Sequence, residues 1–171
     1  MLFRSGIGIT SGAPMTSAAK NLRIASMRPQ LTTAITFETG LDESVLRDLV
    51  DRFYAKVRAD PNLGPIFQAR ITDWGTHLKR MVSFWSSVVL MTGTYRGRPV
   101  PAHTALPVTA AHFSRWLELF RETAREVCPP AGAEHVIARA ERIAHSLQRA
   151  VWDAQAGSVT AAASTGEGII R

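Results

Sequence analysis

The chain has a single cysteine and no hydrophobic run long enough to cross a membrane. Cys128 has no partner for an intramolecular disulfide, which is consistent with a reducing compartment, and we expect a cytoplasmic protein. The main apolar run without strongly polar or charged residues, roughly Val82 to Thr94, contains serines and is shorter than the about 20 apolar residues of a membrane helix. We therefore expect neither a disulfide scaffold nor a membrane protein.

Acidic residues are absent from residues 1–37. Residues 1–40 hold 4 basic and 1 acidic residue, whereas residues 41–155 hold 15 basic and 12 acidic residues, so half of the net charge of +6 belongs to the N-terminal segment. A nucleic-acid-binding protein gathers its basic residues on one face, but here both signs alternate through the body of the chain. The sequence predicts no nucleic-acid partner.

Apolar periodicity is also absent from both ends of the chain. We expect residues 1–38 to form a disordered leader, whose composition also suits a targeting peptide; Met15 and Met27 are alternative starts. After Trp152 the sequence is rich in Ala, Gly, Ser and Thr, which predicts a flexible tail over residues 156–171. One folded domain over residues 39–155 remains, and 171 residues are enough to bury a single core.

Four segments of this domain have helical periodicity, and none alternates like a strand. The predicted helices run from about Glu43 to Ala59, from about Trp74 to Leu90, from the residue after Thr109 to about Val127, and from about Ala133 to Asp153. The expected N-caps are Asp42, Thr72 or Asp73, and Thr109, while prolines end two of the helices. Two long connections favour an all-α fold in which the helices cross and enclose something.

His103 lies between prolines that leave room for about one helical turn: Pro99 and Pro101 precede it and Pro107 follows it. A backbone restricted in this way suits a metal ligand, because the imidazole is held in place before the metal binds. A surface histidine or a helix cap is the alternative. No cysteine pair, His-x-x-His motif or carboxylate cluster has the spacing of a non-haem metal site, whereas a haem needs only one protein ligand.

Three other polar residues fall on apolar helical stripes: Tyr54, His77 and Trp116. Each is either a core residue or a polar group that faces a pocket. A buried indole or phenol needs a partner for its N–H or O–H group. Three such residues on three apolar stripes predict a shared polar spot.

The segment from Leu41 to Asp153 resembles the group III truncated haemoglobins over about two-thirds of the chain. The resemblance lies in six ordered motifs: Phe53-Tyr54-x-x-Val57-Arg58-x-Asp60, Leu63-Gly64-Pro65-Ile66-Phe67, Trp74-x-x-His77 with Phe84-Trp85, Thr92-Gly93-x-Tyr95-x-Gly97-x-Pro99, His103-x-x-Leu106-Pro107, and His112-Phe113-x-x-Trp116-Leu117-x-Leu119-Phe120. It implies an all-α truncated globin fold with two helices packed on two around a haem pocket.

The resemblance also implies residue roles. His103 would be the proximal ligand to the iron of haem b, with Tyr54, His77 and Trp116 on the distal side. The apolar neighbours of the haem or of its supporting core would be Phe53, Met81, Phe84, Trp85, Leu106 and Phe120. Lys79 or Arg80 would meet the haem propionates, unless both are simply solvated.

An iron with one histidine ligand keeps a position open for oxygen, nitric oxide or carbon monoxide. Three distal donors predict tight oxygen binding for storage, sensing or chemistry on nitric oxide and reactive oxygen rather than transport. Two alternatives from other classes stay open. One is a haem enzyme, either peroxidase-like or a nitric oxide dioxygenase that needs a reductase partner; the other is a haem-free helical interaction module.

Overall fold

The computed structural model describes residues 16–104 and 106–165, and within them every regular element is a helix. In chain order the helices are α1 (Ser17–Thr39), α2 (Glu43–Ala59), α3 (Gly64–Gln68), α4 (Trp74–Val89), α5 (Pro99–Thr104), α6 (Ala110–Val127) and α7 (Pro130–Thr165). No helix in the described ranges is long and apolar enough to span a bilayer. The all-α prediction is confirmed.

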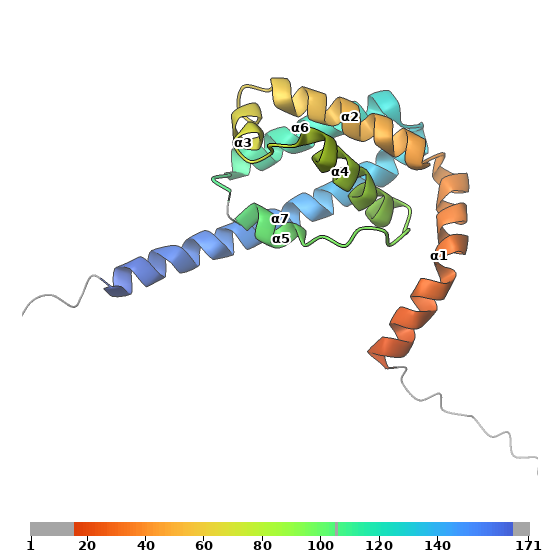
Figure 1. Ribbon diagram of the computed structural model, residues 1–171, viewed down its shortest axis with the longest axis horizontal. Helices are drawn as coiled ribbons and strands as arrows, with labels where there is room; N and C mark the ends of the chain where they lie inside the picture. The colour runs from red at the N-terminus through yellow and green to blue at the C-terminus, as the bar shows by residue number, and fades with distance from the viewer. Residues whose placement is uncertain (1–15, 105, 166–171) are drawn as a thin grey trace, which may run out of the picture.

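Helices α2 and α4 form one packed pair, and α6 and α7 form the other. The pairs meet where α2 packs on α6 and α4 packs on α7, so two helices lie on two (Figure 1). The short helix α5 packs on α7, and α3 packs on the end of α2. This layout places α5 across an interior space from α2 and α4.

Capping hydrogen bonds form at the start of three helices, at the N-cap residues that the sequence predicts. The Asp42 carboxylate accepts a hydrogen bond from the Val45 N–H at 2.9 Å, and Asp73 accepts one from the Thr76 N–H at 3.0 Å. Asp73, rather than Thr72, is therefore the N-cap of α4. Thr109 precedes α6, and its N–H donates to Nδ1 of His112 at 3.0 Å.

The carboxylate of Asp60 joins the end of α2 to α6. It is almost fully buried and accepts hydrogen bonds from the N–H groups of Asn62 and Leu63 and from Nε of Arg115, at 2.9, 3.0 and 2.7 Å. Burial raises the pKa of Asp60, but the Arg115 guanidinium and the two backbone donors outweigh burial and hold the pKa below its ordinary value. The contact fixes the turn that leads into α3.

The ends of the chain differ from the predicted disordered leader and flexible tail. Residues 17–39 form α1 because its final turns pack: Ile35 contacts the core, and the buried Thr39 precedes Gly40, which ends the helix at φ +68°. Helix α7 begins at Pro130, since proline is tolerated in a first turn, and it runs through alanines to Thr165. Residues 1–15 of the leader and 166–171 of the tail lie outside the described residues.

Candidate functional site

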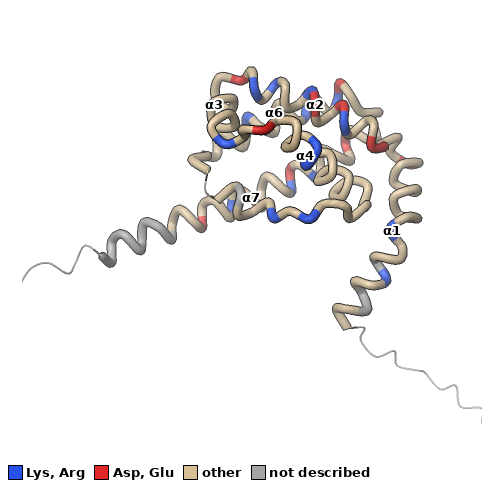
Figure 2. Tube along the Cα trace, in the orientation of Figure 1, with Lys and Arg blue, Asp and Glu red and all other residues tan. Residues whose placement is uncertain are grey.

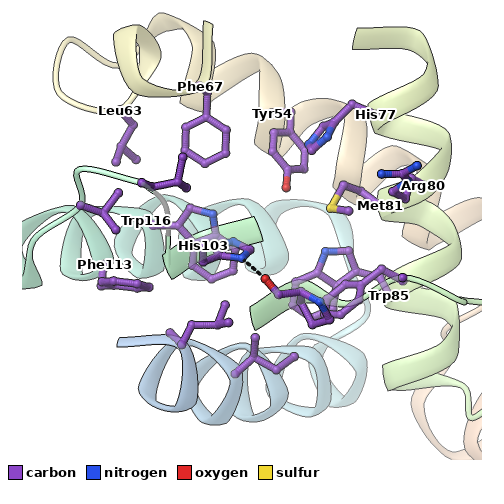
Figure 3. A pocket seen from close by; sticks show the side chains of 18 of the residues that line it. Tyr54, Leu63, Phe67, His77, Arg80, Met81, Trp85, His103, Phe113 and Trp116 are labelled. Carbon is purple, nitrogen blue, oxygen red and sulfur yellow. Dashed lines mark hydrogen bonds between the residues drawn. The ribbon is translucent and has the colours of Figure 1, made fainter. Parts of the chain in front are cut away.

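A cavity of about 270 Å³ lies between the two helix pairs and α5 (Figure 3). Its walls come from α2, α3, α4, α5, α6, α7 and the segment that joins α4 to α5. Nine of the residues predicted for the site line it: Tyr54, His77, Arg80, Met81, Phe84, Trp85, His103, Leu106 and Trp116. Tyr54, His77 and Trp116, which the helical stripes predict to share a polar spot, therefore line the same cavity.

The imidazole of His103 has a defined orientation. Its Nδ1 lies 2.7 Å from the carbonyl oxygen of Pro99, one turn earlier in α5 (Figure 3). Since a carbonyl oxygen only accepts, Nδ1 carries the proton and Nε2 keeps its lone pair. A ligating histidine is held by this kind of backbone bond, which fixes both the tautomer and the ring.

His77 and Tyr54 meet at right angles on another wall of the cavity. Their ring centroids are 5.1 Å apart, and the rings are inclined at 89°. Nε2 of His77 is buried and has no hydrogen-bond partner among the described residues. Burial, followed by the nearby charges of Arg80 and His103, lowers the pKa of His77. A buried nitrogen without a hydrogen-bond partner is rare in folded proteins, so Nε2 of His77 indicates that a bound group supplies its partner.

The hydroxyl of Tyr54 is directed into the cavity (Figure 3). The side chain is 5% exposed, and burial raises its pKa, so that it stays a neutral donor. Trp116, from α6, adds an indole to the lining, and its ring stacks on Phe120 with the centroids 5.2 Å apart. Hydrogen-bond donors from α2, α4 and α6 therefore share one cavity.

Phe53 and Phe120 do not line the cavity but support it from behind. Phe53 is fully buried, and its ring packs edge-on against Tyr54, Trp116 and Phe120 with centroid distances of 5.0 to 5.1 Å. Phe120 also stacks on Trp85 at 4.7 Å. Because aromatic rings pack rigidly, this cluster fixes the walls that carry Tyr54 and Trp116.

Two neighbouring cations of α4 have different positions. Arg80 lines the cavity, whereas Lys79 is exposed and does not. Successive helix residues point about 100° apart, so only one of the two faces the cavity. Of the two residues predicted for the propionates, the structure brings only Arg80 to the site.

Several residues that line the cavity were not predicted from the sequence as site residues. The polar ones are Tyr95, Arg98 and His112, and the others are Leu63, Phe67, Gly97, Pro99, Val108, Phe113, Ile143, Ala144 and Leu147. A signal existed for Tyr95, Gly97 and Pro99, because they belong to a motif that lies just before His103. Nothing in the sequence separates the α7 residues of this set from ordinary core residues.

The lining suits a flat apolar group with a metal at its centre. It is mainly apolar and aromatic, it presents one imidazole with a free lone pair, and it holds one buried imidazole nitrogen without a partner. In the described ranges no cluster of three or more His, Cys, Asp or Glu residues could hold a bare metal ion. A haem fits this donor set, since its porphyrin supplies the remaining ligands.

The comparisons with known proteins agree with this geometry. A family model described as "Bacterial-like globin" matches residues 36–157. The chain belongs to the bacterial-like globin family. The group 3 truncated hemoglobin ctb of Campylobacter jejuni is 35% identical to this globin over 121 residues, which are 68% of this chain and 94% of that protein.

A crystal structure of a group III truncated hemoglobin from Campylobacter jejuni resembles this globin with a TM-score of 0.61 and 33% identity, covering 65% of this chain and 91% of that one. The resemblance read from the six motifs and the truncated globin fold are both confirmed. The family supports a haem-binding globin.

Proposed function

We propose that this globin binds haem b with Nε2 of His103 as the single protein ligand to the iron. The observation that carries the proposal is the bond between Nδ1 of His103 and the Pro99 carbonyl, which leaves Nε2 as the nitrogen free to ligate. Prolines 99 and 101 restrict the backbone of α5, so little ordering remains for the imidazole on haem binding.

A haem held in this way supplies an iron with an open position for a diatomic ligand such as oxygen, nitric oxide or carbon monoxide. Tyr54, His77 and Trp116 supply the donors to that ligand. Tyr54 is neutral because its pKa is raised, and Nε2 of His77 has no other partner in the described chain. Donors fixed in a dry cavity stabilise developing negative charge without reorganising. This arrangement supports tight binding, for storage, sensing or chemistry on the ligand, rather than transport.

Arg80 and Arg98 suit the carboxylates of the haem. Both line the cavity and are exposed at its rim, and neither forms an ion pair within the described residues. No Asp or Glu occurs between Asp73 and Glu118, so this stretch of chain offers them no acidic neighbour. Two exposed guanidinium groups in the wall of one cavity can each hold a carboxylate in bidentate geometry.

Absorption spectra of the full chain reconstituted with haem test the proposal. We expect a Soret band in the wild type that is lost or shifted in His103→Ala, whereas His145→Ala, an exposed histidine of α7, changes nothing. A wild type without a Soret band would favour the haem-free interaction module. An unchanged spectrum in His103→Ala would contradict the ligand assignment.

Stopped-flow consumption of nitric oxide by the oxygenated protein separates an enzyme from a storage or sensing protein. Faster turnover when a reductase is supplied would indicate a nitric oxide dioxygenase. Rates unchanged in both Tyr54→Phe and Trp116→Phe would contradict the distal roles of these residues.

A further inference from the structure

Helix α1 passes beside the segment that joins α4 to α5 (Figure 1). The family match begins at residue 36, so α1 up to Ile35 is an addition to the matched domain. The segment of residues 90–98 has no helix of its own, yet Tyr95, Gly97 and Arg98 line the cavity, and α5 with His103 follows directly.

The start of this segment has a conformation that needs support. Met91 and Gly93 have φ values of 62° and 68°, in the left-handed region. A methionine in this region is less stable than in the ordinary regions, so the surrounding contacts must hold it there.

Donors from other helices bind the last carbonyl groups at the end of α4. His135 and Arg139 of α7 reach the carbonyl oxygens of Val89 and Val88, at 3.2 and 3.3 Å. The next carbonyl, that of Leu90, accepts a hydrogen bond of 2.6 Å from the hydroxyl of Thr32 in α1. These carbonyls have no partner inside α4, so each external donor fixes the direction in which the chain leaves the helix.

Arg28 makes the second contact between α1 and the segment. Its guanidinium lies against Gly93 so closely that a side chain at that position would overlap it. The left-handed turn favours glycine at this position, and its lack of a side chain lets the guanidinium of Arg28 lie against the backbone.

A network of hydroxyl groups continues from this turn toward the cavity. Thr92 bonds to Ser86 at 3.0 Å and to Thr94 at 3.2 Å, and Thr94 bonds to Ser87 at 3.3 Å. The Ser87 hydroxyl accepts the N–H of Tyr95 at 2.7 Å.

The ring of Tyr95 packs edge-on against Phe84 at 5.2 Å, and both side chains line the cavity. Thr32 is thus connected to the wall beside α5 through Leu90, the two residues of chain that follow it, and the hydroxyl network that begins at Thr92.

We propose that Thr32 and Arg28 are positioning residues for the haem site: α1 holds residues 90–98, and through them the wall that carries Tyr95 and leads into α5. The proposal rests on the haem function proposed above. Its consequence is slower loss of the cofactor, because opening of this wall precedes escape of the group. Without the Thr32 hydrogen bond we expect haem loss about fivefold faster.

The test measures transfer of haem from the reconstituted full chain to excess apomyoglobin. Thr32→Val, which keeps the shape but loses the hydroxyl, is expected to lose haem about fivefold faster, and Thr32→Ser to restore the wild-type rate. Thr33→Val is the matched control, because among the described residues the Thr33 hydroxyl bonds only to the Pro29 carbonyl within α1, at 2.9 Å. Equal rates for Thr32→Val and wild type, or equal acceleration by Thr33→Val, would overturn the proposal.

Hydrogen exchange of the haem-free full chain separates this proposal from the haem function. In Thr32→Val the amide of Tyr95 is expected to exchange about fivefold faster, while amides in the middle of α2 and α6 keep their wild-type rates. Unchanged exchange over residues 91–98 would overturn the positioning role, even in a protein that binds haem. A localised increase would support it independently of any haem measurement.

Discussion

Tyr54→Phe is the most direct perturbation of the proposed distal site, because it removes one donor and leaves the ring. Tyr54 is 5% exposed, its hydroxyl faces the cavity, and that hydroxyl makes no hydrogen bond with another described residue. The substitution therefore breaks no internal hydrogen bond. We expect the folding free energy to change by less than about 1 kcal/mol.

The effect on ligand dissociation is expected to be much larger. A hydrogen bond to a group that carries partial charge in a dry cavity contributes about 1.5 to 3 kcal/mol. At 1.4 kcal/mol per factor of ten, its loss accelerates oxygen dissociation by about tenfold to 150-fold. The assay is stopped-flow displacement of oxygen from the reduced, oxygenated holoprotein by excess carbon monoxide.

Tyr95→Phe provides the matched control for this measurement. It is the same chemical change at another tyrosine of the cavity, but the Tyr95 hydroxyl lies against Gly97 in the segment that leads to α5. We expect less than threefold acceleration there, about 0.6 kcal/mol or less. Wild-type dissociation in Tyr54→Phe, or equal acceleration in both variants, would refute the reasoning that Tyr54 bonds the ligand.

Three further predictions concern folding stability, measured by urea denaturation of the haem-free chain. Asp60 has a lowered pKa in the folded state, so its stabilisation is complete above the ordinary value of 3.8 and is lost as pH falls below it; Asp60→Asn is expected to flatten that dependence. His77 also has a lowered pKa, so the unfolded chain takes up the proton first and stability falls as pH drops below 6.5; His77→Leu is expected to reduce this loss. Gly64→Ala is expected to cost about 1 to 3 kcal/mol, because its Cβ would lie 2.7 Å from the Arg58 carbonyl oxygen.

For each of these three substitutions, one result would contradict the physical reason given for it. A wild-type pH profile in Asp60→Asn would mean that the ion pair with Arg115 contributes nothing to acid stability. If the dependence of stability on pH is the same in His77→Leu as in the wild type, the His77 imidazole takes up its proton as readily in the folded protein as in the unfolded chain. Wild-type stability of Gly64→Ala would mean that the turn before α3 shifts freely.

Most charged residues of the described chain are exposed, and both signs are mixed along the helices, so the net charge says little about function. Basic and acidic residues lie close together on α2 and α6, where Lys56 bonds to Glu122 and Glu126 (Figure 2). Pairs in which the carboxylates face solvent in this way contribute little to stability. Arg80 and Arg98 bear on function because they line the cavity, and only this location distinguishes them from the other arginines.

The sequence by itself determined three of the helices, α2, α4 and α6, and their limits. Asp42, Asp73 and Thr109 act within one turn of their own backbone, and the prolines after α2 and α6 act on the residues next to them. The brief turn of His103 is equally local, since Pro99 supplies the carbonyl that holds the ring. Interactions over three or four residues can be read from a sequence because no other part of the chain is needed.

The tertiary structure alone decided which residues share the cavity. Tyr54, His77 and Trp116 belong to three helices, and the packing of these helices places all three side chains in the wall of one cavity. Which face of α4 meets the cavity also depends on this packing, and it is the face with Arg80 and not the one with Lys79. Helix α1 formed where its composition predicted disorder, because its last turns pack against the core and α7. Packing between distant segments has no local signature, so it becomes visible only when the chain is folded.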